Sequence, residues 1–385
     1  MGVNFEFTTV SKIIFGQGSF EKIPELVTGQ GKKVLLVTGK NTALAHRLGK
    51  ELNGTPISFE IFSVVNEPTT HDIQSGTELA RKTGCDIVVG IGGGSAIDSA
   101  KAIAALVPNK GELTDYLEVI GKGLKLTETP LPCFAVPTTA GTGAEVTRNS
   151  VIKSTEHQVK VSLRSELMYP RIALVDPALT VTTPPEITAS TGVDALTHLL
   201  ETFVSIQSNP YIDMFCREGI KRVSVSLLRA FTDGNDMDAR ENMALASMFG
   251  GIALANVKLG AVHGFAGPLG GMCPVPHGAA CACLLPATME VNISALKKEN
   301  REQQLTKFDE VARILTGRKS AVADDGTIWA KELVRKLRIP SLSAFGLSPG
   351  DFPELVKKAQ VSSSIKGNPV ELNPEQLLSI LEKSF

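Results

Sequence analysis

Two histidines in one glycine- and proline-rich stretch are the first residues in this sequence that suggest chemistry. The stretch, VHGFAGPLGGMCPVPHGA at 262–279, contains His263 and His277 and lies between two segments of helical pattern. A third histidine, His198, follows Asp194 by four residues, so on a helix both side chains would leave the same face. Imidazole and carboxylate groups are usual ligands of borderline divalent metals. We therefore predict that Asp194, His198, His263 and His277 hold one metal ion.

Each half of this predicted site also has a purely structural interpretation. An aspartate and a histidine one helical turn apart form a common polar pair in a helix. The two later histidines could instead bond backbone carbonyl groups in a loop. The chain has six histidines, and half of them fall in these two contexts, which favours the metal interpretation. Three neutral imidazoles and one carboxylate would leave room on the ion for a substrate oxygen.

The composition limits the classes of protein to which this chain can belong. Its 385 residues are enough for two domains, and its 43% hydrophobic and 21% charged residues are ordinary for a globular protein. A formal net charge of −1 argues against a surface for nucleic acid or for an anionic membrane. No uninterrupted apolar segment has the length of a membrane span, and the first residues lack a signal-peptide pattern. We expect a cytoplasmic protein.

The six cysteines support this expectation. They are scattered and lie mostly in apolar surroundings, and Cys281 and Cys283 are too close in sequence for a zinc knuckle. We expect buried, reduced thiols rather than disulfides or metal ligands. The cysteines are Cys85, Cys133, Cys216, Cys273, Cys281 and Cys283.

The first half of the chain alternates short apolar runs with segments of helical periodicity. Such alternation is typical of a parallel sheet covered by helices on both faces. The expected strands lie within 34–39, 57–65, 86–95, 132–145 and 171–176, and the expected helices are 44–52, 71–83 and 95–107.

The pattern changes near residue 180. Pro184 and Pro185 follow a threonine that could cap a helix, and helical periodicity dominates from there on. No convincing strand interrupts it. We therefore predict an α/β domain over 1–180 and an all-α domain over 181–385. The expected helices are 186–204, 211–231, 239–257, 279–293, 301–315, 326–337 and 374–385.

Two small-residue turns in the first half could bind a dinucleotide. The segment from Gly92 to Ser95 joins a predicted strand to a predicted helix, where backbone N–H groups and a helix N-terminus could hold a pyrophosphate. Its glycine spacing only approximates the dinucleotide fingerprint, and alone it fits a tight structural turn equally well. A second turn, 138–143, follows another strand. Both turns would meet at one edge of a parallel sheet, which favours dinucleotide binding.

Four motifs in this order resemble those of the iron-containing, or group III, alcohol dehydrogenases. They are GGGSAIDSAKAIA at 92–104, TTAGTGAEVT at 138–147, GVDALTHLLE at 192–201, and HGFAGPLGG with VPHG within 263–278. The resemblance extends over nearly the whole chain. It implies a dehydroquinate synthase-like fold, with an N-terminal Rossmann-like domain, a C-terminal helical metal-binding domain and the metal in a cleft between them. It also implies hydride transfer between an alcohol bound to a divalent metal and the nicotinamide of NAD or NADP.

The resemblance assigns roles by position. Asp194, His198, His263 and His277 match the metal ligands, with Fe2+, Zn2+ or another divalent ion as the cofactor. Asp98 and Lys101 match a GGGSxxDxxK pattern, in which Asp98 is expected to face the nicotinamide or the substrate and Lys101 to be structural. Asp98 and His277 are the expected catalytic residues. The residues that match the cofactor side are Gly39, Gly93, Gly94, Ser95, Asp98, Thr138, Thr139, Thr142, Asn149 and Lys160.

This sequence departs from the family pattern at two positions. Many members have an acidic residue after the first strand, where it excludes a 2′-phosphate, whereas this chain has Gly39 followed by Lys40. The loss of the carboxylate favours NADP, or at least tolerates it. Many members also have a further histidine four residues after the first histidine of the metal stretch. Gly267 stands there, so a proton would leave through ribose hydroxyls, His277 or water, and the substrate pocket would be larger.

Two alternatives of different kinds stay open at this point. Dehydroquinate synthase and glycerol dehydrogenase share the scaffold, although the TTAGTGAE and PHG motifs favour the alcohol dehydrogenases. The second alternative is a non-catalytic module that binds a nucleotide and a metal. As partners we expect a small alcohol or aldehyde, no nucleic acid and no membrane, and we expect a homodimer or a larger homo-oligomer.

Overall fold

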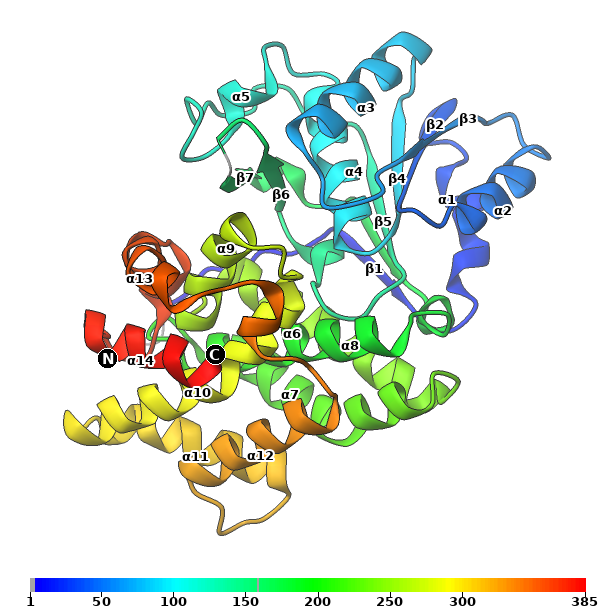
Figure 1. The fold of residues 1–385 in the computed structure, drawn as a ribbon. Helices are drawn as coiled ribbons and strands as arrows, with labels where there is room; N and C mark the ends of the chain where they lie inside the picture. Colours follow the sequence, from blue (N-terminus) through cyan, green and yellow to red (C-terminus); the bar gives the residue numbers. More distant parts are fainter. Residues whose placement is uncertain (1–3, 158) are drawn as a thin grey trace. The chain divides into compact units, whose positions relative to one another are not determined.

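The computed structural model describes residues 4–157 and 159–385, which form two compact units (Figure 1). The α/β unit contains Thr9–Thr139 and Gly143–Thr180. The helical unit contains Val181–Phe385, the described residues up to Thr8, and the short segment Ala140–Thr142. The chain therefore enters the helical unit briefly within the second small-residue turn.

A six-stranded parallel sheet forms the centre of the α/β unit, in the order β1-β8-β5-β4-β2-β3. The five expected strands are confirmed. The additional strand β1 is short and half-exposed at the sheet edge, so it lacks the long apolar run that identifies the others. The strands are β1 (Lys12–Phe15), β2 (Lys33–Thr38), β3 (Ser58–Ser63), β4 (Ile87–Gly92), β5 (Cys133–Pro137) and β8 (Ile172–Val175).

Strand β2 shows why the inner strands have uninterrupted apolar sequences. Its side chains alternate between the two faces of the sheet, and both faces are covered. Val34 and Leu36 pack in the cluster that includes α1 (Ile23–Val27) and α2 (Ala43–Leu52). Leu35 and Val37 pack in the cluster that includes α3 (Thr70–Thr83) and α4 (Gly94–Leu106). All four side chains are fully buried.

An antiparallel hairpin of β6 (Asn149–Ser154) and β7 (Val159–Arg164) adds to this unit. It is not among the expected elements, and neither is the short helix α5 (Leu113–Tyr116). Only one face of the hairpin is buried, with Ile152 and Val161 inside, so its sequence is mixed and polar rather than a continuous apolar run. Strand β6 packs against α4.

The helical unit has one hydrophobic core in which α6, α7, α8 and α10 pack together. All seven expected helices are confirmed, and the described residues from 181 onward contain no strand. The helices are α6 (Pro185–Val204), α7 (Pro210–Thr232), α8 (Met237–Asn256), α9 (Ala261–Met272), α10 (His277–Lys298), α11 (Glu302–Thr316), α12 (Ala323–Lys336), α13 (Phe352–Val361) and α14 (Pro374–Ser384).

The first histidine of the metal stretch lies on a helix, which corrects the interpretation of the stretch as a connecting segment. Helix α9 covers Ala261–Met272 despite its glycines and the proline at position 268. Val262, Phe265, Ala266 and Leu269 follow helical spacing and are fully buried. Burial of this apolar face outweighs the poor helix propensity of glycine and proline.

Helix α10 is the one single helix in the described residues that is long and apolar enough to span a membrane. However, 83% of its apolar window is buried inside the protein, as is usual for a core helix. All six cysteines are free thiols, and four of them are buried.

Candidate metal centre and cofactor-binding residues

Four side chains from three helices meet in the helical unit. Asp194 and His198 come from α6, His263 from α9 and His277 from the first residue of α10. One potential ligand atom from each residue lies within 4.8 Å of all the others. Asp194 Oδ1 is 3.5 Å from His263 Nε2, and 3.7 Å from both His198 Nε2 and His277 Nε2. The structure thus brings together all four residues that we expected to hold a metal.

The state of these groups fits a cation. Asp194 Oδ1 is buried and has no hydrogen-bond partner among the described residues, which is costly for a carboxylate oxygen unless an ion lies against it. Burial alone would raise the pKa of Asp194, but the imidazoles of His198, His277 and His263 hold this pKa well below its usual range. Burial lowers the pKa of His198 to about 3. An ionised carboxylate and a neutral imidazole are the forms in which these side chains bind metals. Burial lowers the pKa of His263, but its contacts with Cys281, Asp194 and Glu201 outweigh burial and raise this pKa above its ordinary value, so an ion would have to displace the proton of this ring.

A fifth residue, Glu201, orients one of the histidines and was missed by the sequence analysis. Glu201 Oε2 lies 2.7 Å from His263 Nδ1, and both side chains are buried. Glu201 Oε1 accepts a hydrogen bond of 2.7 Å from the Val262 N–H. With Nδ1 bonded to the carboxylate, the lone pair of Nε2 faces Asp194. Glu201 follows Asp194 by seven residues, and this spacing was the available signal for a shared helix face.

The N-terminus of α9 is held by a second buried group. Asn368 Oδ1 accepts a hydrogen bond of 3.1 Å from the Ala261 N–H, and the same side chain is paired with Asn292 on α10. A Cβ atom on Gly260 would lie 2.8 Å from Glu201 Oε1 and 2.9 Å from Asn368 Oδ1. Glycine is therefore required at the start of the helix that carries His263.

Glycine is also required directly after His277. A Cβ atom on Gly278 would lie 2.5 Å from the backbone oxygen of Ser190, so a larger residue would push α10 away from α6. This close approach places His277 beside Asp194. The side chain of His277 is 37% exposed, whereas the side chains of the other three residues are 2–6% exposed. The centre is therefore open to solvent on the His277 side.

In the α/β unit, the two small-residue turns adjoin each other. Strand β4 ends at Gly92 and α4 begins at Gly94, with Gly93 between them as an N-cap that has no side-chain acceptor. The Thr138 N–H donates to the Gly92 oxygen over 2.9 Å. A Cβ atom on Gly93 would lie 3.4 Å from Thr139 Oγ1. Of the expected cofactor contacts, only Thr142 belongs to the helical unit.

Gly39 lies at the same edge of the sheet as the two small-residue turns. It follows β2, the neighbour of β4, and its N atom would be 3.5 Å from a Cβ atom on Gly92. Strand β2 is bordered by β3 on one side and by β4 on the other, so the strand order reverses there. Ligands of open α/β sheets bind outside the carboxyl ends of the strands at such a switch point.

Asp98 and Lys101 form an ion pair of 2.9 Å on α4, in which the aspartate side chain is 14% exposed. Lys101 Nζ also donates to the Ala144 oxygen, to Thr147 Oγ1 and to the Asn149 oxygen, and its side chain is fully buried. Asp98 Oδ2 accepts a hydrogen bond of 2.9 Å from the Val151 N–H. These contacts tie α4 to the hairpin and to the segment after the second turn.

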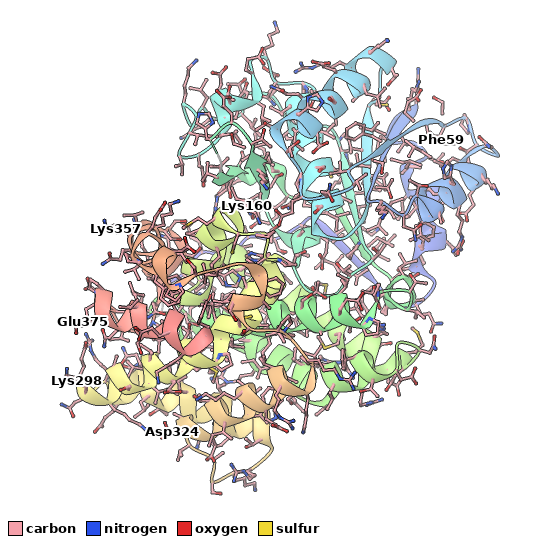
Figure 2. The ribbon with its side chains drawn as sticks, in the orientation of Figure 1. Phe59, Lys160, Lys298, Asp324, Lys357 and Glu375 are labelled. Carbon is pink, nitrogen blue, oxygen red and sulfur yellow. The ribbon has the colours of Figure 1, made fainter. Side chains whose placement is uncertain are left out.

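Lys160 lies on β7 (Figure 2), and its Nζ is 2.6 Å from Glu67 Oε1. Lys160 is 8% exposed at its side chain, and Glu67 is 44% exposed. The pair therefore lies at the surface of the α/β unit with the lysine side chain covered.

Comparisons with known proteins agree with this geometry. The family described as iron-containing alcohol dehydrogenase matches residues 10–177, and its C-terminal counterpart, Fe-containing alcohol dehydrogenase family, C-terminal, matches residues 188–385. Alcohol dehydrogenase 4 of Saccharomyces cerevisiae is 35% identical over 378 residues, which cover 96% of each chain.

Solved structures of similar proteins have the same fold. The structure of a 1,3-propanediol oxidoreductase matches with a TM-score of 0.92 and 32% identity, and covers 100% of both chains. A sulfoacetaldehyde reductase from Bifidobacterium kashiwanohense, solved in complex with NAD+, matches with a TM-score of 0.88 and 28% identity over 100% of this chain and 99% of the other. The expected α/β Rossmann-like and helical architecture is confirmed. The chain belongs to the family of iron-containing alcohol dehydrogenases, and it is a metal-dependent oxidoreductase that exchanges hydride between an alcohol and a nicotinamide cofactor.

Proposed function

We propose that Asp194, His198, His263 and His277 hold one divalent ion and that the chain uses this ion to oxidise small alcohols or to reduce the corresponding aldehydes or ketones. The observation that supports this most directly is Asp194 Oδ1, which is buried without a hydrogen bond and lies 3.5–3.7 Å from three imidazole nitrogens. In this proposal residues 1–180 form the cofactor domain and residues 181–385 form the metal domain.

When bound, the ion supplies a Lewis acid that polarises an alcohol or carbonyl oxygen. The protein side chains prepare for this. Asp194 contributes a negative charge in a buried site, and His198 is kept neutral by burial. Glu201 fixes the ring of His263 so that its Nε2 faces the site. The ordering of these groups before substrate arrives limits the reorganisation needed during the reaction.

On the cofactor side, the N-terminus of α4 would receive the pyrophosphate. Gly93 and Gly94 allow close approach of the phosphate to the backbone, and the helix dipole favours the negative charge. Ser95, Thr138, Thr139 and Thr142 would donate hydrogen bonds, and Asn149 and Lys160 are further cofactor-side residues. At Gly39, the absence of a carboxylate together with the charge of Lys40 favours NADP.

For Asp98 the contacts favour a positioning role. Its two carboxylate oxygens bind Lys101 and the Val151 N–H. Through these bonds Asp98 would hold the hairpin that carries Asn149 and Lys160. His277 is the proposed ligand nearest to solvent, so we propose that the substrate arrives on its side and that the proton leaves there through water or ribose hydroxyls.

We also propose the setting in which this enzyme works. Free thiols and a near-neutral net charge support a cytoplasmic location. Homo-oligomerisation is proposed from the family resemblance. The relatives named above act on a propanediol and on sulfoacetaldehyde, so short, polar alcohols and aldehydes are the first substrates to test.

The deciding experiment couples metal analysis of the purified protein to an alcohol and aldehyde screen with NAD and NADP. We expect about one divalent ion per chain and turnover that stops on chelation and returns on addition of metal. Asp194→Ala and His263→Ala should each abolish metal binding and turnover. Turnover that persists in the metal-free protein or in these variants would contradict the proposal.

A further inference from the structure

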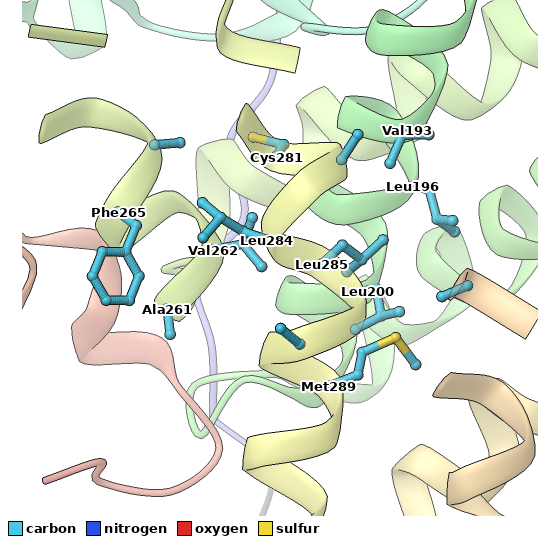
Figure 3. Packing of buried hydrophobic residues seen from close by; sticks show 14 of the residues in the cluster. Val193, Leu196, Leu200, Ala261, Val262, Phe265, Cys281, Leu284, Leu285 and Met289 are labelled. Atoms are coloured by element: carbon cyan, nitrogen blue, oxygen red, sulfur yellow. The ribbon is translucent and has the colours of Figure 1, made fainter. Parts of the chain in front are cut away.

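A small cavity lies in the core of the helical unit, beside the carboxylate that orients His263. Its volume is about 10 Å³, and all the residues that line it are buried. The apolar part of its wall includes Leu200, Leu285 and Met289 (Figure 3). A cavity of about 10–15 Å³ can hold one water molecule when two to four polar groups are within reach. The polar side chains that line this cavity belong to Glu201, Thr288, Asn292 and Asn368.

The hydroxyl of Thr288 is the group at this cavity that lacks a partner. Thr288 is buried, and its Oγ1 has no hydrogen bond to any part of the chain that the structure describes. Other threonines on helices of this unit donate to the carbonyl four residues earlier. Thr197 donates to the Val193 oxygen over 2.7 Å, and Thr202 to the His198 oxygen over 2.6 Å. Because a buried hydroxyl without a partner is costly, a partner inside the cavity would be favourable.

Asn292 has a hydrogen-bond donor to spare at the same cavity. It follows Thr288 by four residues on α10, so the two side chains leave the same face of the helix. Asn292 donates to Asn368 Oδ1 over 3.2 Å and accepts from Asn368 Nδ2 over 2.7 Å. Among the described residues this uses one of its two N–H groups, so the other remains for a further acceptor. Asn368 is fully used as a donor, because its Nδ2 also bonds the Val370 oxygen.

Glu201 provides an acceptor for the missing link. Its Oε1 accepts from the Val262 N–H and its Oε2 bonds His263 Nδ1, both over 2.7 Å. Each carboxylate oxygen can accept a second hydrogen bond. We propose that the cavity holds one water molecule that accepts hydrogen bonds from Thr288 and Asn292 and donates one to Glu201. Three hydrogen bonds are usual for a buried water.

This water makes Thr288 a positioning residue for His263. The additional hydrogen bond holds the carboxylate of Glu201 from the side of α10, and that carboxylate in turn holds the imidazole. Partners that orient a metal-binding histidine affect metal affinity without touching the ion. The positioning role therefore rests on the proposed metal site, whereas the water site depends only on the cavity and its polar lining.

The helical unit supplies a matched control at Thr327 on α12. Its hydroxyl is also buried and without a partner among the described residues, but Thr327 does not line the cavity. Thr288→Val and Thr327→Val therefore remove the same group from the same unit, and only the first removes a partner of the water. Thr288→Ser keeps the hydroxyl and serves as the conservative variant.

A crystal structure of the full-length wild type tests the water site. We expect one ordered water within hydrogen-bond distance of Thr288 Oγ1, Asn292 Nδ2 and an oxygen of Glu201. A dry cavity, or a water without a bond to Glu201, would overturn the proposal and leave the proposed function intact. This measurement needs no variant, so it decides the question even if Thr288→Val folds poorly.

The affinity for Zn2+, measured by competition with a chelator, tests the positioning role. Thr288→Val should bind Zn2+ about tenfold more weakly than the wild type, at the lower end of the range for groups that orient a metal ligand. Thr288→Ser and Thr327→Val should bind it as the wild type does. Wild-type affinity in Thr288→Val, or a loss that also appears in Thr288→Ser, would overturn the positioning role. Failure of the wild type to bind Zn2+ would overturn both this role and the proposed function.

Discussion

His263 Nδ1 and Glu201 Oε2 are 2.7 Å apart in a buried environment, and Glu201 uses its other oxygen for the Val262 N–H. One carboxylate therefore binds both the imidazole and the backbone of the helix turn that carries it. This arrangement sets the direction of His263 Nε2 more firmly than a single hydrogen bond could, because ring and backbone are fixed to the same group.

Replacing Glu201 by Gln should weaken metal binding by about 10- to 100-fold. In the amide, an NH2 group replaces one of the two acceptor oxygens that face His263 Nδ1 and the Val262 N–H, so one of these two groups loses its acceptor. Titration with a competing chelator measures the change. Glu186→Gln, an exposed glutamate on the same helix, is the control and should bind metal as the wild type does. Equal metal affinity in Glu201→Gln and the control would show that Glu201 does not position the ligand.

Removal of the ion should destabilise the protein. A ligand that binds only the folded state contributes about 2.7 kcal/mol at one hundred times its Kd. We therefore expect chelation to lower the Tm of the wild type and metal to restore it. Asp194→Asn should show no response to either treatment, since a neutral amide replaces the central carboxylate. Differential scanning calorimetry with and without added Zn2+ measures the Tm of the wild type and of Asp194→Asn. An unchanged Tm of the wild type on chelation would contradict the expected stabilisation by the ion.

The buried Glu145 predicts a pH dependence of stability in the α/β unit. Burial raises its pKa from 4.5 to about 7, although the charge of Lys101 opposes this shift. The folded state then holds the proton more tightly than the unfolded chain, so stability falls as pH rises from about 4.5 to about 7. The loss amounts to about 3 kcal/mol.

Glu145→Gln should remove this part of the pH dependence. The free energy of unfolding of the variant, minus that of the wild type, should increase between pH 5 and pH 8 in urea titrations. Glu156→Gln, at an exposed position of the same unit, should leave the wild-type slope unchanged. A difference that stays constant over this range would refute the assignment of the slope to Glu145.

Gly39→Asp should reverse the preference for NADP. Among the described residues other than its chain neighbours, the only atom within 4 Å of a Cβ at this position is the Val64 oxygen at 4.0 Å, so the side chain can be accommodated. The new carboxylate would repel a 2′-phosphate and could bond the ribose of NAD. We expect kcat/KM with NADP to fall at least tenfold and kcat/KM with NAD to stay equal or to rise. A wild type with a strong preference for NAD would already contradict the proposal.

Gly267→His should narrow the substrate range. Gly267 follows His263 by one helical turn. In the described part of the chain, no atom outside the backbone of its own helix and its chain neighbours lies within 4 Å of a Cβ at this position. The imidazole would therefore occupy open space on the face of α9 that carries His263. We expect the ratio of kcat/KM for a long alcohol to that for a short one to fall about tenfold, or about 1.4 kcal/mol. The control is Gly267→Ala, which changes the same position of the helix without adding an imidazole. A glycine elsewhere, such as Gly317, would not serve, because its φ is positive and an alanine there would be strained.

The sequence predicts most elements of both units because their apolar residues follow clear periods. The buried strand β2 has an uninterrupted apolar run, and the spacing of Asp194 and His198 places both on one helix face. Helix α9 could not be predicted, because its glycines and proline argue locally against a helix. It is stabilised by burial of its apolar face and by the hydrogen bonds that its first N–H groups donate to Glu201 and Asn368. Likewise, Glu201 contacts Val262 and His263, which follow it in the sequence by 61 and 62 residues. These contacts exist only in the folded chain, so local patterns could not predict them.

The cap on α9 by Asn368 has a consequence for the order in which this protein matures. The metal-facing end of α9 is completed by residues 61 positions earlier, at Glu201, and 107 positions later, at Asn368. Contacts between such distant segments cost loop-closure entropy before they stabilise the fold, so we expect this end of α9 to be completed late in folding. Tight metal retention should therefore report a helical unit whose folding is finished, and immature chains should exchange their metal rapidly.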